Sequence, residues 1–360
     1  MQGEQVTAIW KPLFQDYGIH IDFAYPSFEW ESEASNKANV FCVIIGFSCS
    51  DTKKERLLYK NGVFNKVENI NPYLLPSNNV FVEPRNKPID NENLMWAGGK
   101  PTDGGYLILS EQEKNDIIEK NKNIEKYIRP YMMGKDFIER KNRYCLWLVD
   151  VPPNEYSDCK EVINRIKSVK EFRLSSTKTA TVKKAQTPML FDEIRESECD
   201  YIAIPSVSSN SRRYIPIDYL SKDIIPGNML YCLSVDSLYL FGILTSNVHM
   251  SWMRTVSGKL GEGYRYSNTI VYNTFPFPQK ITPRQKVEIE QTAQQILDVR
   301  AKYPDCSLAD LYDDLVMPSN LREAHRANDR AVMQAYGFPI KMTESECVAE
   351  LMKMYENLTK

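Results

Sequence analysis

The sequence predicts an α+β protein built in three parts, and three observations support this prediction. A short amphipathic helix and two strands come first, isolated strands alternate with helices in the middle, and the last stretch is helical throughout. We place the parts at residues 1–55, 56–280 and 281–360. A chain of 360 residues is long enough to form two or three hydrophobic cores.

The first part contains a strand whose expected neighbours are not in the chain before it. Residues 5–14 are predicted to form a helix, and residues 19–25 and 38–47 two strands joined by a turn. The second strand is continuously apolar, which is typical of a strand buried on both faces within a large sheet. Too little chain precedes it to build such a sheet, so we expect the remaining strands to lie upstream of Met1.

The middle part begins with a connector and continues as a mixed domain. Residues 51–105 are polar and rich in Asn and Pro, which indicates an extended segment. Ser110 and Glu113 have the spacing of a capping box, and Ser237 is placed to cap a helix that carries Trp252. The other predicted elements are a helix at 161–174 and strands at 143–149, 201–207, 214–217 and 229–233.

The last part carries the signals of several helix ends. Thr282 and Gln285 form a capping box, with Pro283 at the first helical position. A second helix begins at Ser319 and ends at Gly337, and a third begins at Thr343, which forms a capping box with Glu346. We therefore predict an all-helical C-terminal domain.

Composition and motifs exclude several classes of protein. The longest apolar run, 40–47, is too short to span a bilayer, and the N-terminus lacks a basic stretch leading into an apolar one. These features favour a cytoplasmic protein without a membrane partner. The eight cysteines are scattered without a CxxC pair, which indicates free core thiols.

No catalytic or metal-binding constellation is visible in the sequence. The histidines at 20, 249 and 325 lie inside apolar elements and are interpreted as structural residues. The metal motif HExxH, the nucleophile motif GxSxG and the phosphate loop are absent. The glycines at 258, 261 and 263 follow a helix, so they do not form the turn that holds S-adenosylmethionine. We expect this chain to bind no cofactor by itself.

Charge is distributed unevenly, although the net charge is only −2. Cations crowd the segment from 160 to 184, namely Lys160, Arg165, Lys167, Lys170, Arg173, Lys178, Lys183 and Lys184. Such a density suits salt-sensitive binding to phosphates. A solvated helix face is the alternative interpretation.

A second cluster of cations lies between 212 and 278, among glycines and aromatic residues. Arg212 and Arg213 occupy a Ser/Asn turn between apolar runs, Arg254 ends a helix, and Lys259 and Arg265 surround a glycine-rich loop. Arginine can grip a phosphate or a guanine edge with two donors, and glycine lets backbone approach a ligand closely. Together these residues predict a surface that reads DNA, whereas each one alone would be an ordinary solvated residue.

Four blocks of sequence, in this order, carry a resemblance to a known family. They are GIHIDFAYPSFEW within 2–47, KPTDGGYLIL within 100–150, SSNSRRYIPI and RYSNTIVYNTFPFP within 208–278, and LYDDLVMPSNLREAHRANDRAVMQAYG at 311–337. Over essentially its whole length the chain resembles the C-terminal half of the single-polypeptide restriction-and-modification enzymes of the MmeI type, and related adenine-specific DNA methyltransferases.

The resemblance implies that residues 1–55 close the sheet of a class I methyltransferase domain whose catalytic half lies upstream. That half would bind S-adenosylmethionine and methylate adenine, with or without a nuclease on the same polypeptide. In the family the hairpin turn supplies an aromatic side chain that stacks on the flipped-out adenine. Phe28, or else Trp30, would take that role here, and packing at a turn is the alternative.

The resemblance further implies that residues 56–280 are a target recognition domain. Arg265 is the leading base reader, and relatives often carry charged side chains at the positions of Gly261 and Gly263. Because glycine has no side chain, either Glu262 reads a cytosine in place of those charged side chains, or the base pair that they would contact is not read.

Four further cations, Arg212, Arg213, Arg254 and Lys259, are expected to bind phosphates. The helical segment from 281 would pack on the recognition domain and help it surround double-stranded DNA. The leading hypothesis is therefore the sequence-recognition part of an adenine methyltransferase. The alternative is a stand-alone DNA-binding specificity or regulatory subunit without enzyme activity.

Overall fold

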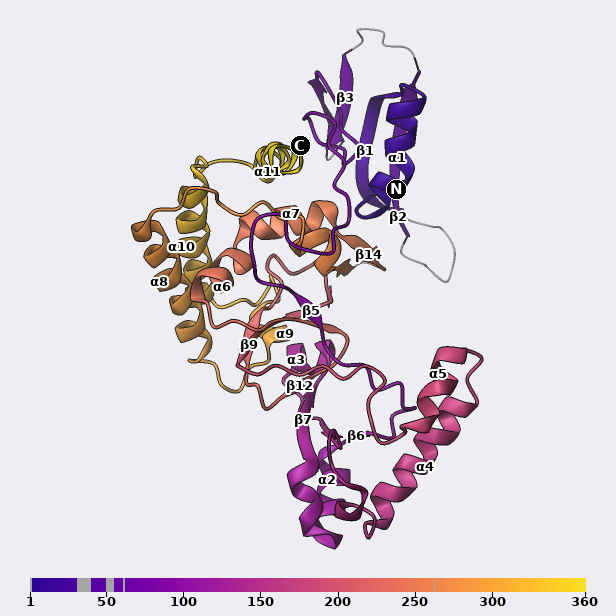
Figure 1. Cartoon of the computed structure of the whole chain (residues 1–360). Helices are drawn as coiled ribbons and strands as arrows, with labels where there is room; N and C mark the ends of the chain where they lie inside the picture. Colours follow the sequence, from indigo (N-terminus) through magenta and orange to yellow (C-terminus); the bar gives the residue numbers. More distant parts are fainter. Residues whose placement is uncertain (1, 31–39, 50–54, 61, 262) are drawn as a thin grey trace.

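The computed structural model describes residues 2–30, 40–49, 55–60, 62–261 and 263–360. It confirms the α+β class, with small sheets and a helical C-terminal region. The larger of two hydrophobic cores draws side chains from along the whole chain, from Val6 to Tyr355. The smaller core, between Leu107 and Ile225, belongs to a lobe that projects at the bottom of Figure 1.

The N-terminal sheet has the strand order β2-β1-β3-β4 and is preceded by helix α1. These elements are α1 (Gln5–Asp16), β1 (His20–Trp30), β2 (Val40–Ser48), β3 (Arg56–Lys60) and β4 (Val63–Val67). Strand β1 pairs antiparallel with β2, which confirms the predicted hairpin, and parallel with β3. The prediction of an extended connector was wrong for 56–67. The ring of Tyr59 stacks on that of Tyr25 at 3.9 Å and gives β3 a partner that a local pattern does not reveal.

The central sheet has the antiparallel strand order β11-β9-β13-β5. Its strands are β5 (Trp96–Ala97), β9 (Tyr201–Pro205), β11 (Asp218–Leu220) and β13 (Leu230–Leu233). The predicted strand at 214–217 was wrong, because strand pairing begins only at Asp218. The backbone N–H of Ile215 points instead at the sulfur of Met250.

Four helices lie near the central sheet, three of them (α6, α8 and α10) on the left in Figure 1 and α7 above the sheet. They are α6 (Leu238–Thr245), α7 (Asn247–Val256), α8 (Pro283–Arg300) and α10 (Ser319–Tyr336). The single helix predicted after Ser237 is divided into α6 and α7. Ser246 divides it, because its hydroxyl accepts a hydrogen bond from the backbone N–H of His249 and caps α7.

The projecting lobe contains a sheet of order β12-β7-β8-β6. Its elements are β6 (Ile108–Leu109), β7 (Ile128–Met132), β8 (Tyr144–Leu146), β12 (Ile225–Pro226), α2 (Glu111–Lys120), α4 (Lys160–Leu174) and α5 (Thr179–Lys183). The predicted capping box of Ser110 and Glu113 is present, but α2 ends at Lys120 and a 3-10 turn, Lys122–Tyr127, follows.

The remaining elements are short, apart from the last helix. They are β10 (Val207–Ser208), β14 (Gly258–Leu260), β15 (Gly263–Arg265), α3 (Gly134–Glu139), α9 (Leu308–Leu311), α11 (Glu344–Thr359), a π-helical turn at Asn268–Tyr272 and 3-10 turns at Pro153–Glu155 and Lys184–Gln186. The capping boxes predicted at Thr282 and Thr343 are both present. Gly337 ends α10 with a φ of 71°, as predicted.

Helix α11 joins the end of the chain to its beginning. It packs against α7, and Met352 accepts a hydrogen bond at 3.4 Å from the side chain of Asn71. The hydroxyl of Tyr355 accepts another from the backbone N–H of Glu83, at 3.1 Å. The C-terminal segment is therefore part of the main core.

Two predictions from composition can be compared with the structure. In the described part of the chain, no helix has both the length and the apolar character needed to cross a membrane. All eight cysteines are free, and four of them, Cys145, Cys159, Cys232 and Cys347, are buried. Cys49 and Cys199 are exposed, so the expectation of core thiols is wrong for these two.

Candidate nucleic-acid interface

A small hairpin presents Arg265 to solvent. Strands β14 and β15 pair with each other and with β10 in the order β10-β15-β14, so β15 lies in the middle. Because side chains alternate along a strand, Arg265 is exposed while Tyr266 is buried. The hydroxyl of Tyr266 lies 3.0 Å from Nε2 of His249 on α7, which anchors the hairpin to the core.

The two hairpin glycines differ in the room around them. Gly261 lies at the turn with a φ of 57°, and a Cβ there would meet nothing within 4 Å. A Cβ on Gly263 would lie 2.8 Å from the carbonyl oxygen of Ser208, which real structures avoid. Only position 261 therefore has space for a side chain. Glu262 lies outside the described residues.

Lys259 and Arg213 lie on the segments that flank β15. Lys259 is exposed on β14, with its ammonium 4.1 Å from the ring centroid of Tyr264. Arg213 is exposed on the turn after β10, with its guanidinium 5.7 Å from the ring centroid of Tyr214. Its neighbour Arg212 is half-buried, and this burial lowers the pKa of the guanidinium.

Arg254 differs from the other cations, because three protein groups already hold its guanidinium. Nε donates to Glu344 at 2.7 Å, Nη1 to the carbonyl of Arg213 at 2.9 Å and Nη2 to the side chain of Asn247 at 3.0 Å. The side chain is only 17% exposed. These contacts fix the Arg213 turn against α7 and leave Arg254 less available for a phosphate than the sequence suggested.

A buried carboxylate, Asp329 on α10, supports the same turn. It accepts hydrogen bonds from the hydroxyl of Tyr214 and from the backbone N–H of Asn247, each at 2.7 Å. Burial raises its pKa above the usual range. On its other side Tyr214 stacks on His325, with ring centroids 4.2 Å apart. Sequence reasoning missed Asp329, although an acidic residue amid the apolar positions of α10 was a usable signal.

Phe28 and Trp30 lie in strand β1 and not in the turn where the sequence placed them. Strand β1 extends to Trp30, which pairs with Val40, while Phe28 pairs with Cys42. The register shifts between Tyr25 and Phe28, which redirects the end of the strand. Phe28 is half-buried.

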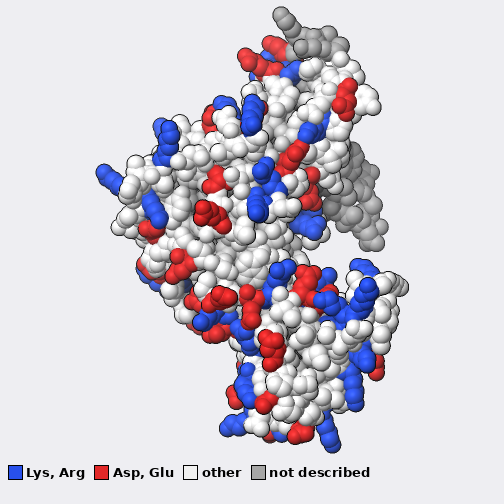
Figure 2. Space-filling model, in the orientation of Figure 1, with Lys and Arg blue, Asp and Glu red and all other residues white. Residues whose placement is uncertain are grey.

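The basic segment from 160 to 184 divides into structural and exposed cations. Arg173 is fully buried and donates to five backbone carbonyls, those of Pro101, Thr102, Lys184, Thr187 and Leu190, at 2.7–3.0 Å. Arg165 pairs with Glu113, and Lys184 with Asp192. The exposed members are Lys160, Lys167, Lys170, Lys178 and Lys183, and Figure 2 shows basic side chains along this edge of the lobe.

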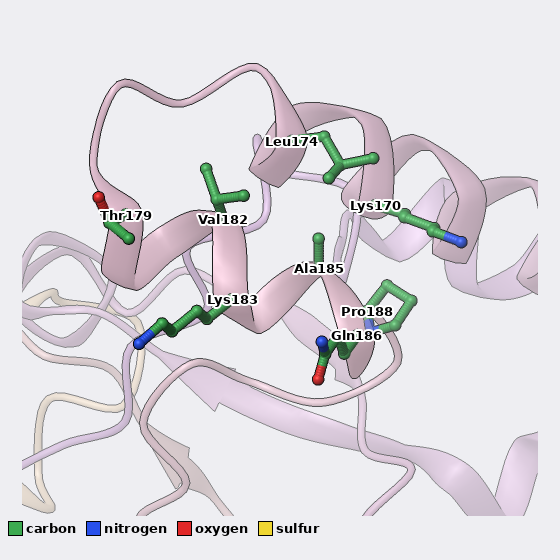
Figure 3. A pocket seen from close by; sticks show the side chains of 8 residues that line it. All are labelled: Lys170, Leu174, Thr179, Val182, Lys183, Ala185, Gln186 and Pro188. Carbon is green, nitrogen blue, oxygen red and sulfur yellow. The ribbon is translucent and has the colours of Figure 1, made fainter.

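A hollow of about 560 Å³ lies between the end of α4 and α5. Figure 3 shows apolar side chains, including Leu174 and Val182, with Lys170 and Lys183 at its sides. Elsewhere in the described ranges, His, Cys, Asp and Glu side chains form no group of three or more that could hold a metal ion.

Comparison with known proteins accounts for nearly the whole chain. Residues 1–60 match the family description "MmeI, DNA-methyltransferase domain", residues 76–279 match "MmeI, target recognition domain", and residues 281–360 match "MmeI, C-terminal domain". DNA methyltransferase A of Bacillus subtilis (strain 168) is 38% identical over 358 residues, which are 99% of this chain and 40% of that protein.

A solved structure gives the same result. The type IIL restriction-modification enzyme MmeI, in complex with DNA, matches with a TM-score of 0.92 and 41% identity over 99% of this chain. The match covers 48% of the MmeI chain, so this chain spans less than half the length of either relative. The family matches and this structural similarity confirm the resemblance, and the chain belongs to the MmeI family.

Proposed function

We propose that this chain selects the DNA sequence for an S-adenosylmethionine-dependent adenine methyltransferase of a cytoplasmic restriction-modification system. A catalytic half, upstream on the same polypeptide or on a separate subunit, would transfer the methyl group. The observation that carries the proposal is the hairpin with Arg265 exposed on its central strand, inside the region that matches a target recognition domain. The similar MmeI structure holds DNA.

The order of the strands supports separate roles for the exposed cations. Strand β15, with Arg265, lies between β14, which carries Lys259, and β10, which leads to Arg213. Lys259 pairs with Tyr264 and lies over its ring, so it leaves the sheet on the face opposite to Arg265, and the two cations would meet different parts of a duplex. Phosphate contacts fix the register of a protein on the duplex, and base contacts select the sequence. Arginine suits the central position because its two donors match O6 and N7 of guanine.

The tip of the hairpin has room for the DNA backbone or a base edge. Gly261 has no side chain and open space around its Cα, so a duplex can approach it closely. The buried Tyr266 and its contact with His249 keep the strand from moving when Arg265 engages a base. A rigid support is what a specific base contact requires.

The N-terminal sheet supports a separate catalytic half. Strand β2 forms one edge of its sheet, and the side chains of Phe23, Ile44 and Phe47 are 38%, 44% and 50% exposed. An apolar edge strand of this kind is normally covered or paired. We infer that the remaining methyltransferase strands join it there, which would place Phe28 near the flipped adenine.

Two hollows of the described residues carry cationic side chains. One is flanked by Lys170 and Lys183, and the other is lined by three arginines. Such walls favour anions. We assign no step of methyl transfer to these residues and propose that the catalytic half binds S-adenosylmethionine.

Selection from a random pool of duplexes, with the catalytic half added back, tests the proposal. Wild-type chain should enrich one sequence, and its affinity should fall steeply with salt. Arg265→Ala should relax the choice at one base pair by about 1–3 kcal/mol, whereas Arg213→Ala should weaken binding to all sequences alike. Arg284→Ala, an exposed arginine at the start of α8, is the matched control. Equal losses on every sequence for Arg265→Ala and Arg213→Ala would refute the separate roles.

A further inference from the structure

Three arginines from separate parts of the chain line one hollow of about 310 Å³. Arg212 and Arg213 come from the turn after β10, and Arg254 comes from α7. The other lining residues are polar or acidic, namely Asn210, Ser211, Asn247, Asp314 and Glu344. The hollow lies where the recognition segment meets the C-terminal segment, which contributes the two acidic residues.

The acidic residues of the hollow already have cationic partners. Asp314 pairs with Arg322 at 3.0 Å, and Glu344 pairs with Arg254 at 2.7 Å. Arg212 and Arg213 make no ion pair among the described residues. Asp313 lies near Arg212, and Tyr214, Asp329 and Asp314 act on Arg213, so part of the positive charge of the two side chains remains for an anion.

The guanidinium of Arg212 is only partly satisfied by the protein. Its Nε is buried and lacks a hydrogen-bond acceptor within the part of the chain that the structure describes. A buried donor without an acceptor costs about 1–3 kcal/mol, and more when it is charged. Because Nε is closed to solvent, an oxyanion in the hollow would balance the charge of the guanidinium without bonding to this atom.

The walls of the hollow are held in place before any ligand arrives. Arg254 donates to the carbonyl of Arg213, and Asp329 accepts from Tyr214 and from the start of α7. Helix α10 thereby fixes both the arginine turn and the helix opposite. Binding of an oxyanion there would therefore not include the free-energy cost of ordering these elements.

We propose that this hollow binds one phosphate group of the DNA backbone, with Arg212 and Arg213 as its cationic ligands. The assignment to DNA rests on the proposed function, whereas the preference for an oxyanion rests on the hollow itself. The C-terminal segment would support the site through Asp329 without supplying a ligand, because the two residues it brings to the hollow are acidic.

Inorganic phosphate tests the preference for an oxyanion. Unfolding temperature is measured with phosphate or with chloride at equal ionic strength. Phosphate should raise the unfolding temperature of the wild-type chain and of Arg284→Gln, but should have a much smaller effect on Arg212→Gln. Arg213→Gln provides a second variant if Arg212→Gln does not fold. Equal effects of phosphate on all folded variants would overturn the site.

Duplexes with a single neutral methylphosphonate distinguish a backbone phosphate from free phosphate. A methylphosphonate at one position of the enriched sequence should lower the affinity of the wild-type chain and of Arg284→Gln about tenfold. The same substitution should lower the affinity of Arg212→Gln less than twofold. If phosphate stabilises through Arg212 and no such position exists, the site takes free oxyanions and the DNA assignment is overturned. If no duplex binds at all while phosphate still stabilises through Arg212, the proposed function fails and the oxyanion site stands.

Discussion

Acid should loosen the elements that carry Arg213 and Arg265, because two buried histidines lie behind them. His249 contacts Tyr266, the residue after Arg265, and His325 stacks on Tyr214, the residue after Arg213. Burial lowers the pKa of His249 and of His325 to about 3. Both imidazoles therefore remain neutral in the folded protein well below pH 6.

The size of the effect follows from the two pKa values. An unfolded histidine has a pKa of about 6.5, so the stability due to the lowered pKa is complete above that pH and is lost as the pH falls toward 3. Between pH 7 and pH 5 the unfolded state gains a proton at each histidine and the folded state does not. The cost is about 2 kcal/mol for each residue, or about 4 kcal/mol for both.

Urea unfolding at pH 7 and pH 5 measures this cost. The wild-type chain should lose about 4 kcal/mol more on acidification than a His249→Gln, His325→Gln variant, and each single variant should recover about half. Burial raises the pKa of Asp90 to about 6, so its protonation in the folded state increases the free energy of unfolding between pH 7 and pH 5. This increase is the same in every variant. Equal pH dependence in the wild-type chain and the double variant would refute the reasoning.

Two further predictions concern the hairpin and the lobe. Gly261→Asp should change the free energy of unfolding by no more than about 1 kcal/mol and should change the selected sequence. Gly263→Asp should lower the affinity for every DNA sequence, because its Cβ would meet the carbonyl oxygen of Ser208. Arg173→Met should destabilise the chain by about 3 kcal/mol or more in urea, because five carbonyls lose their donor, and Lys170→Met, exposed on the same helix, should change stability by less than about 0.5 kcal/mol.

Local signals in the sequence predicted local structure well. The capping boxes at Ser110, Thr282 and Thr343 were found because each depends on two residues three positions apart. The antiparallel hairpin of β1 and β2 was also predicted, since its apolar pattern lies within the strands themselves.

Contacts between distant residues were beyond the reach of these signals. Arg254 and Arg173 were counted among the cations that could meet DNA, but some of the partners that hold them inward lie far away in sequence. Glu344 is 90 residues from Arg254, and Thr102 is 71 residues from Arg173. No spacing rule connects positions so far apart. For the same reason the support that Asp329 gives to the Arg213 turn became visible only in the structure.

The contacts of helix α11 with residues 71–83 set a time scale for folding in the cell. Met352 and Tyr355 follow their partners Asn71 and Glu83 by 281 and 272 residues. At about 5–20 residues per second, the ribosome delivers them about 15 to 55 seconds later. During that interval residues 71–83 lack these two contacts, and we expect chaperones to bind the apolar side chains that α11 later covers. A ribosome that stalls before α11 would release a product that proteases remove.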